Sequence, residues 1–174
     1  GDPLFGTALL KWNATHLPWT HEWYQLPIFY PIPDPLALAE HLLGVSVIAA
    51  PMQWLIGSPL VTYNLVVLLS FPLCGLAIYA PAWRLTHTRA AAFLAGLAYA
   101  FAPYRISQLS HIQVLAAWGM PIALLGLHAY LETRQRRWLA VFGVSWLLQS
   151  MANGYYLVFF TGVIGLWVAW FMAA

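Results

Sequence analysis

Leu60–Trp83 reads LVTYNLVVLLSFPLCGLAIYAPAW, a run of 24 residues without a charged side chain. A helix needs about 20 predominantly apolar residues to cross the hydrocarbon core of a bilayer, so this stretch is long enough to span a membrane. It contains Asn64, Pro72 and Gly75, which packed membrane helices tolerate. The stretch therefore predicts a transmembrane helix and an all-α membrane fold.

Four more apolar stretches follow, each separated from the next by a short polar loop. The predicted spans are 60–83, 90–104, 112–131, 138–152 and 155–174. We expect an all-α integral membrane protein in which residues 60–174 form a multi-span helical bundle. Asn153 and Gly154, between the last two spans, are interpreted as a turn. Because the chain starts without methionine and stops inside an apolar run, we also expect a fragment truncated at both ends.

The composition agrees with a membrane protein and excludes other classes. The chain is 62% hydrophobic and 7% charged, whereas a soluble domain is about 25% charged. A net charge of +2 is too small and too scattered for nucleic-acid binding. The single cysteine, Cys74, allows no internal disulfide, and the spacing of cysteines and histidines predicts no metal site.

The distribution of arginines predicts the orientation. Five of the seven basic residues lie in two loops, 84–89 and 132–137, which fall on one side of the membrane if the spans alternate. The positive-inside rule makes that side cytoplasmic. Loops 104–111 and 153–154 then face outward, as do residues 1–59. We therefore expect residues 1–59 to form the first extracytoplasmic loop.

Residues 1–41 differ in composition from the rest of the chain. They contain four of the five acidic residues, and their six prolines predict that no continuous helix forms. We expect a long, ordered, aromatic loop that is too apolar to be disordered. The following segment, 42–56, is apolar but too short to span, and it contains Pro51. It predicts a helix lying along the membrane interface.

Short motifs occur in a characteristic order along the chain. They are Gly1-Asp-Pro3, Phe29-Tyr-Pro31, Glu40-His41-Leu-Leu-Gly44, Asn64 near the start of a span, Ala102-Pro-Tyr-Arg105 and His111-Ile-Gln113. Together with the predicted topology, this order resembles bacterial membrane glycosyltransferases of the GT-C superfamily, the relatives of polyprenyl-phosphate-sugar-dependent mannosyl- and arabinosyltransferases. The resemblance covers nearly the whole chain.

The resemblance implies an enzyme of the bacterial inner membrane. Such an enzyme transfers a sugar with inversion from a polyprenyl-phosphate donor to a lipid, glycan or protein acceptor at the outer face, where it also contacts membrane lipids. An acidic residue near the start of the outer loop acts as the catalytic base, which here is Asp2. Asp34 and Glu40 are the alternatives, because no second acid follows Asp2 until Glu22. Some relatives use a divalent metal and others do not.

The outward-facing polar residues are the candidates for substrate binding. Inverting transfer needs a carboxylate to accept the acceptor's proton and a cation or dipole to stabilise the leaving phosphate. Lys11 and Arg105 are the outward-facing bases and therefore the candidates for the phosphate. The full substrate-binding set is Lys11, Asp34, Glu40, His41, Tyr104, Arg105, His111 and Gln113.

Structural alternatives remain for these residues, and two alternatives remain for the function. Asp2 could cap a helix that begins at Pro3, Arg105 could extend to lipid headgroups, and Tyr104 could anchor the chain at the interface. The other structural alternatives are a polar helix face for Glu40 and His41, the outer end of the third span for His111 and Gln113, and an interface charge for Lys11. The protein could also be a non-catalytic lipid- or partner-binding protein of the same fold. A transporter is the third reading, although the predicted spans contain no charged residue well inside them.

Overall fold

The computed structural model describes residues 2–173; Gly1 and Ala174, which open and close the predicted ranges, lie outside the described residues. The structure is all-helical, as predicted. Its elements are α1 (Asp2–Thr15), α2 (His21–Tyr24), the 3-10 helix η1 (Pro35–Leu38), α3 (Leu43–Ile56), α4 (Pro59–Thr86), α5 (Arg89–Ala100), α6 (Pro103–Ser107), α7 (Ile112–Leu115), α8 (Gly119–Thr133), α9 (Arg136–Ala152) and α10 (Gly154–Ala173).

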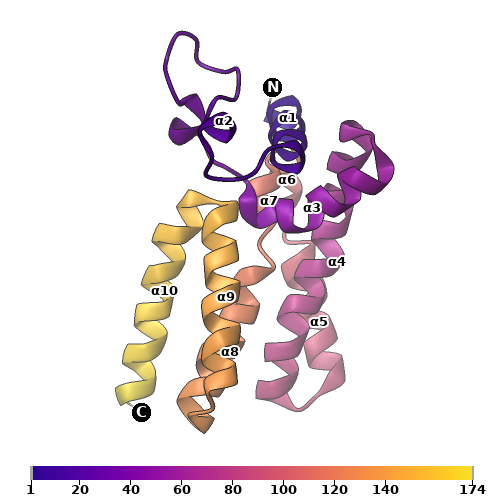
Figure 1. Ribbon diagram of the computed structural model, residues 1–174. Coiled ribbons are helices and arrows are strands. Elements are labelled where there is room, and N and C mark those ends of the chain that lie inside the picture. Colours follow the sequence, from indigo (N-terminus) through magenta and orange to yellow (C-terminus); the bar gives the residue numbers. More distant parts are fainter. Residues whose placement is uncertain (1, 174) are drawn as a thin grey trace.

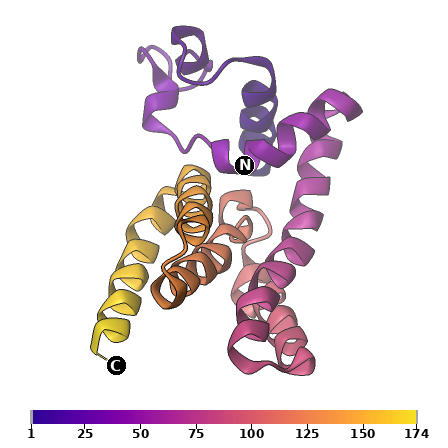
Figure 2. The same ribbon diagram turned by 60° about the horizontal axis from the view of Figure 1, so that its bottom comes forward.

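The helices form two layers (Figure 1). The long helices α4, α5, α8, α9 and α10 run up and down in alternation, and α1, α2 and α3 sit together over one end of them. Turned by 60°, the α4–α5 hairpin lies on one side and the group α8–α10 on the other, below this end layer (Figure 2). The two groups are in contact, because α4 packs against α8. The alternation predicted from the loops is therefore present in the fold.

Three segments are long and apolar enough to cross a membrane: Pro59–Thr86, Ile112–Thr133 and Gly154–Ala173. Helices α5 and α9, which were also predicted as spans, have 12 and 17 residues. α5 packs along α4, and α9 packs along α8. The chain is thus a multi-pass membrane protein with three candidate spans, and the membrane-spanning role of α5 and α9 stays a prediction.

Two predicted spans are interrupted by irregular backbone. The segment 90–104 stops being helical after Ala100, because Pro103 starts a new short helix, α6, and restricts the residue before it. The segment 112–131 is broken between α7 and α8, at residues 116–118. Backbone carbonyls freed by such a break must find donors inside the protein if it lies in a membrane. Arg105 supplies one, because its Nη2 donates to the Leu115 carbonyl at 2.7 Å.

The prediction of a loop without a continuous helix over residues 1–41 is wrong for its first third. α1 is a regular helix of 14 residues, because Pro3 lies in the first turn, where a missing N–H costs nothing, and the next proline is Pro18.

The end layer of α1, α2 and α3 is held together by the buried side chain of Asn13. Its Nδ2 donates to the His41 carbonyl at 2.7 Å, and its Oδ1 accepts from Trp23 Nε1 at 2.8 Å.

α3 matches the short helix predicted at 42–56, beginning at Leu43. It packs directly on α9 at Gly44, where a Cβ atom would lie 1.8 Å from the Leu148 carbonyl oxygen. Near its other end, Trp54 and Leu55 are 69% and 88% exposed. Such exposed apolar side chains suit the interfacial position predicted for this helix.

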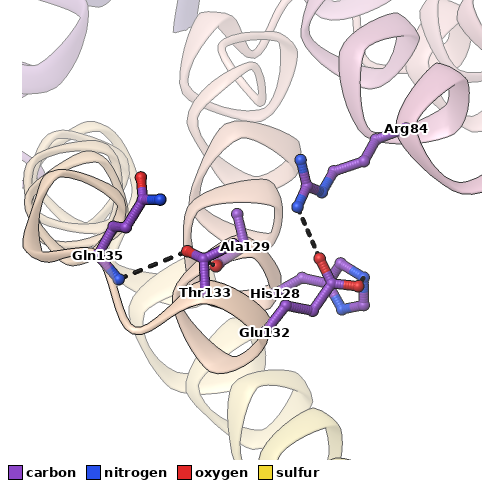
Figure 3. Close-up of polar contacts among 6 residues, drawn as sticks. All are labelled: Arg84, His128, Ala129, Glu132, Thr133 and Gln135. Carbon is purple, nitrogen blue, oxygen red and sulfur yellow. Dashed lines mark hydrogen bonds and ion pairs between the residues drawn. The ribbon is translucent and has the colours of Figure 1, made fainter.

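The two arginine-rich loops lie at the same end of the bundle. Arg84 Nη2, near the end of α4, is 2.6 Å from Glu132 Oε2 at the end of α8, and the contact is drawn in Figure 3. The Arg84 guanidinium also lies 5.9 Å from the ring centroid of Trp138, in the first turn of α9. This end is opposite the layer of α1, α2 and α3 (Figure 1).

Candidate functional site

Asp2 and His111 are 109 positions apart in the sequence, yet they meet at the end of the bundle covered by α1. His111 Nε2 lies 2.9 Å from Asp2 Oδ2. The first turns of α1 are brought there by close packing at Gly6, whose Cβ, if present, would lie 2.9 Å from the ring of Tyr63 and 3.4 Å from Ile112. The contact thus depends on α1 being helical and on α1 packing against α4 and α7.

The environment of this pair keeps it accessible. The side chains of Asp2 and His111 are 61% and 35% exposed. His111 Nδ1 lies 3.1 Å from Ser110 Oγ, so the serine hydroxyl can donate to Nδ1 while Nε2–H donates to Asp2. This arrangement favours the tautomer that carries its proton on Nε2. Within residues 2–173, Asp2 Oδ1 makes no hydrogen bond.

His111 also lines an open cleft of about 1050 Å³. The cleft is lined by residues of α6, α7 and the start of α10, together with Glu40 from the segment before α3. Its walls are polar toward the end layer and apolar along α10. The lining residues are Glu40, Tyr104, Gln108, His111, Gln113, Val114, Asn153, Gly154, Tyr155, Tyr156, Val158 and Phe159. Four members of the predicted binding set, Glu40, Tyr104, His111 and Gln113, are therefore brought together.

The start of α10 is held by two side chains, Asn153 directly before the helix and Glu40 from the end layer. Asn153 is buried, and its Oδ1 accepts from the N–H groups of Tyr155 and Tyr156 at 2.8 and 3.3 Å. The Gly154 N–H donates to Glu40 Oε1 at 3.2 Å. Asn153 is thus the N-cap of α10 rather than only a turn residue. It also donates to the Gln113 carbonyl at 3.3 Å, which joins α10 to α7.

Burial changes the titration of two predicted site residues. Partial burial raises the pKa of the Glu40 carboxyl, and the hydrogen bond from the Gly154 N–H offsets this in part. Burial lowers the pKa of His41, whose ring lies 5.1 Å from that of Trp23 inside the end layer. Glu40 is therefore a carboxyl group that holds its proton more tightly than usual beside the cleft.

The raised pKa of Glu40 predicts a pH-dependent stability. The folded protein binds this proton more tightly than the unfolded chain. The contribution of Glu40 to stability is therefore fully present below the ordinary pKa of 4.5 and is lost as pH rises through the raised value. Glu40→Gln keeps an acceptor for the Gly154 N–H but cannot titrate. We expect its unfolding temperature to fall less between pH 4.5 and neutrality than that of the parent protein. Exposed Glu22, changed to Gln, is the control and should leave the parent's pH slope unchanged.

Asp2 is not a lining residue of the cleft and is connected to it through its contact with His111. The remaining candidates do not line the cleft either. Arg105 is 5% exposed and points into the bundle, where Nε donates to the Ala100 carbonyl at 3.1 Å and the guanidinium lies 5.7 Å from the rings of Phe71 and Tyr99. Lys11 is exposed on α1, about two and a half turns beyond Asp2. Asp34 is exposed and accepts from Gln25 Nε2. His41 lies within the end layer.

The structure adds polar residues to the site that the sequence reasoning did not select. Ser110 contacts His111, Gln108 lines the cleft, and Asn153 organises α10. For Asn153 a signal was available, since an Asn directly before a long apolar run is typical of an N-cap. Among the described residues, 2–173, no three His, Cys, Asp or Glu side chains are grouped closely enough to hold a metal ion.

The fold and the three candidate spans define the chain as a multi-pass helical membrane protein with a cleft at one end that has both polar and apolar walls. Comparison with family models, with curated proteins and with solved structures finds no match to the chain. Its function is therefore argued from the site.

Proposed function

We propose that the protein is a membrane glycosyltransferase that transfers a sugar from a polyprenyl-phosphate donor to an acceptor hydroxyl at the extracytoplasmic face, with inversion. The observation that carries this proposal is the contact between Asp2 and His111 at the edge of an open cleft. A carboxylate held by a histidine, with one oxygen free, is suited to accept a proton from a bound hydroxyl group.

The reaction needs one base and no separate acid. The acceptor oxygen attacks the anomeric carbon, its proton passes to Asp2, and the bond from that carbon to the phosphate oxygen breaks, so that polyprenyl phosphate leaves as an anion. His111 orients the Asp2 carboxylate through Nε2–H. Inversion follows because the acceptor attacks from the side opposite the leaving group.

Neutral donors in the cleft would bind the leaving phosphate. Tyr104, Gln108 and Gln113 line the cleft and carry O–H or N–H groups that can donate to phosphate oxygens. Lys11 and Arg105, the bases considered from the sequence, do not line it. Farther along α10 the wall continues with exposed Val158 and Phe159. An apolar wall next to a polar site suits a ligand with a phosphate and a long prenyl chain.

The proposal is tested by supplying membranes that contain the protein with a panel of labelled polyprenyl-phosphate sugars. We expect label transfer from at least one donor, and a product whose anomeric configuration, measured by NMR, is opposite to that of the donor. Membranes without the protein are the control. Failure of every donor to transfer label, or a product with retained configuration, would contradict the proposal.

A further inference from the structure

The cleft contains a carboxyl group but no basic side chain that would balance an anion. Of the lining residues within 2–173, Glu40 is the only acid, and none is a lysine or an arginine. Arg105 does not line the cleft, and its guanidinium donates to two backbone carbonyls inside the bundle. A phosphate in this cleft would therefore meet a carboxylate, and the two negative charges would repel each other.

The carboxyl group of Glu40 is held in place by one oxygen and presents the other. Oε1 accepts from the Gly154 N–H at 3.2 Å, which fixes the group beside the start of α10. Within residues 2–173, Oε2 makes no hydrogen bond, and it is not a buried atom. Oε2 is therefore available to a ligand, as an acceptor when the group is ionised and as an O–H donor when it carries a proton.

The neutral form of this carboxyl group suits an anionic ligand. Partial burial raises the pKa of Glu40 by more than the hydrogen bond from the Gly154 N–H lowers it, so the neutral form is more available here than at an exposed position. A protonated carboxyl group has no charge and donates to a phosphate oxygen. An anion bound beside Glu40 raises this pKa further, because a neighbouring negative charge favours the neutral form. Ligand and proton therefore stabilise each other in the cleft.

The other titratable groups near Glu40 do not supply the missing positive charge. His111 lines the cleft but contacts Asp2, so this pair has no net positive charge even when the histidine is protonated. The His41 ring lies 5.1 Å from that of Trp23 inside the end layer. The lining tyrosines, which are neutral below about pH 10, are Tyr104, Tyr155 and Tyr156. The charged residues of the end layer that are exposed and do not line the cleft are Lys11, Glu22 and Asp34.

We propose that the cleft binds its anionic ligand together with one proton, which Glu40 carries as a neutral carboxyl group that donates to a phosphate oxygen of the ligand. The inference rests on the proposed function for the class of ligand, a phosphodiester on a prenyl chain. Glu40 thereby determines the pH range in which the cleft accepts an anion. Affinity is highest below the pKa of Glu40 in the free protein, decreases as pH rises from that value to the higher value in the complex, and is constant above it.

The test measures binding of undecaprenyl methyl phosphate to the purified protein in a neutral detergent, between about pH 5 and about pH 8. This probe is a phosphodiester, so its own charge is constant in this range, and its binding requires no transfer reaction. We expect its dissociation constant to increase about tenfold or more with pH, a typical coupling between two linked sites. Undecaprenol, which has the same chain without the charge, should show no such increase. Absence of binding of the phosphodiester, or binding that does not change with pH, would overturn the proposal.

Two variants identify the group that takes up the proton. Glu40→Gln keeps an acceptor for the Gly154 N–H and adds an N–H donor that cannot titrate, so it should bind the probe at high pH about as tightly as the parent protein does at low pH. Glu22→Gln, at an exposed position outside the cleft, is the matched control and should keep the parent's pH dependence. If Glu40→Gln also keeps it, the proton is held elsewhere and the proposal is wrong.

The binding and transfer experiments separate this inference from the proposed function. Sugar transfer by a protein whose affinity for the phosphodiester does not depend on pH would support the enzyme and contradict the role of Glu40. Affinity that depends on pH through Glu40, without transfer from any donor, would support the role of Glu40 and contradict the enzyme.

Discussion

Replacing Asp2 with asparagine is expected to lower the rate of sugar transfer about a hundredfold or more, the usual size of a general-base effect. Asparagine is isosteric with aspartate, and its carbonyl oxygen can still accept from His111 Nε2, so the contact of 2.9 Å need not be lost. The variant removes only the ability to take a proton. Initial rates should be compared with the parent protein in membranes at matched expression, with the best donor of the panel.

The control for this prediction is the exposed carboxylate that the sequence left as an alternative base. Asp34 contacts Gln25 in the end layer, whereas Asp2 contacts His111, which lines the cleft, so Asp34→Asn should transfer sugar at nearly the parent rate. A large loss in Asp34→Asn together with a small loss in Asp2→Asn would assign the base to Asp34. The Asp2 mechanism would then be wrong.

Gly44→Ala is expected to destabilise the protein strongly, because a Cβ added at Gly44 makes the closest contact of any glycine among residues 2–173. The new Cβ would lie 1.8 Å from the Leu148 carbonyl oxygen and 2.8 Å from the Ala152 nitrogen. Both atoms are backbone of α9, so they cannot rotate away, and α3 must move off the bundle. Overpacking of this kind costs roughly 1–3 kcal/mol. A clear decrease in the unfolding temperature in detergent should report it.

The same substitution should also affect the site, because Glu40 lies four residues before Gly44 and holds the start of α10. Gly143→Ala is the matched control. Gly143 is on α9 itself, and a Cβ there would meet nothing within 4 Å, so the change should be neutral or slightly stabilising. If Gly44→Ala unfolds at the same temperature as Gly143→Ala, the close packing of α3 on α9 does not exist in the protein.

The helical membrane class and much of the topology could be predicted from the sequence, because hydropathy and charge act locally. The uncharged run 60–83 lies within α4, and the short apolar segment 42–56 corresponds to α3. The arginine-rich loops lie at one end, as the alternation of spans predicts. These features depend on properties that a window of about 20 residues contains.

What the sequence could not predict depends on contacts between distant segments. The number of prolines in 1–41 led to the wrong prediction that no helix forms there. α1 contains only Pro3, and a proline in the first turn does not interrupt a helix. Arg105 is predicted to face outward because it lies in a loop between two spans. In the structure its side chain turns inward, because the helix break after α7 leaves the Leu115 carbonyl without a helical partner and Arg105 donates to it. The motif order selected both Asp2 and His111 as candidates, whereas their contact requires α1 to pack against α4 and α7.

A double-mutant cycle on Asp2 and His111 tests the central claim most directly. The kcat/KM for transfer would be measured for the parent protein, Asp2→Asn, His111→Gln and the double variant. If His111 acts by orienting the Asp2 carboxylate, His111→Gln lowers kcat/KM in the parent background but changes it little once Asp2 is already asparagine. The double variant should then be about as active as Asp2→Asn alone. Losses that multiply would mean that the two residues act independently, and this result would contradict the account.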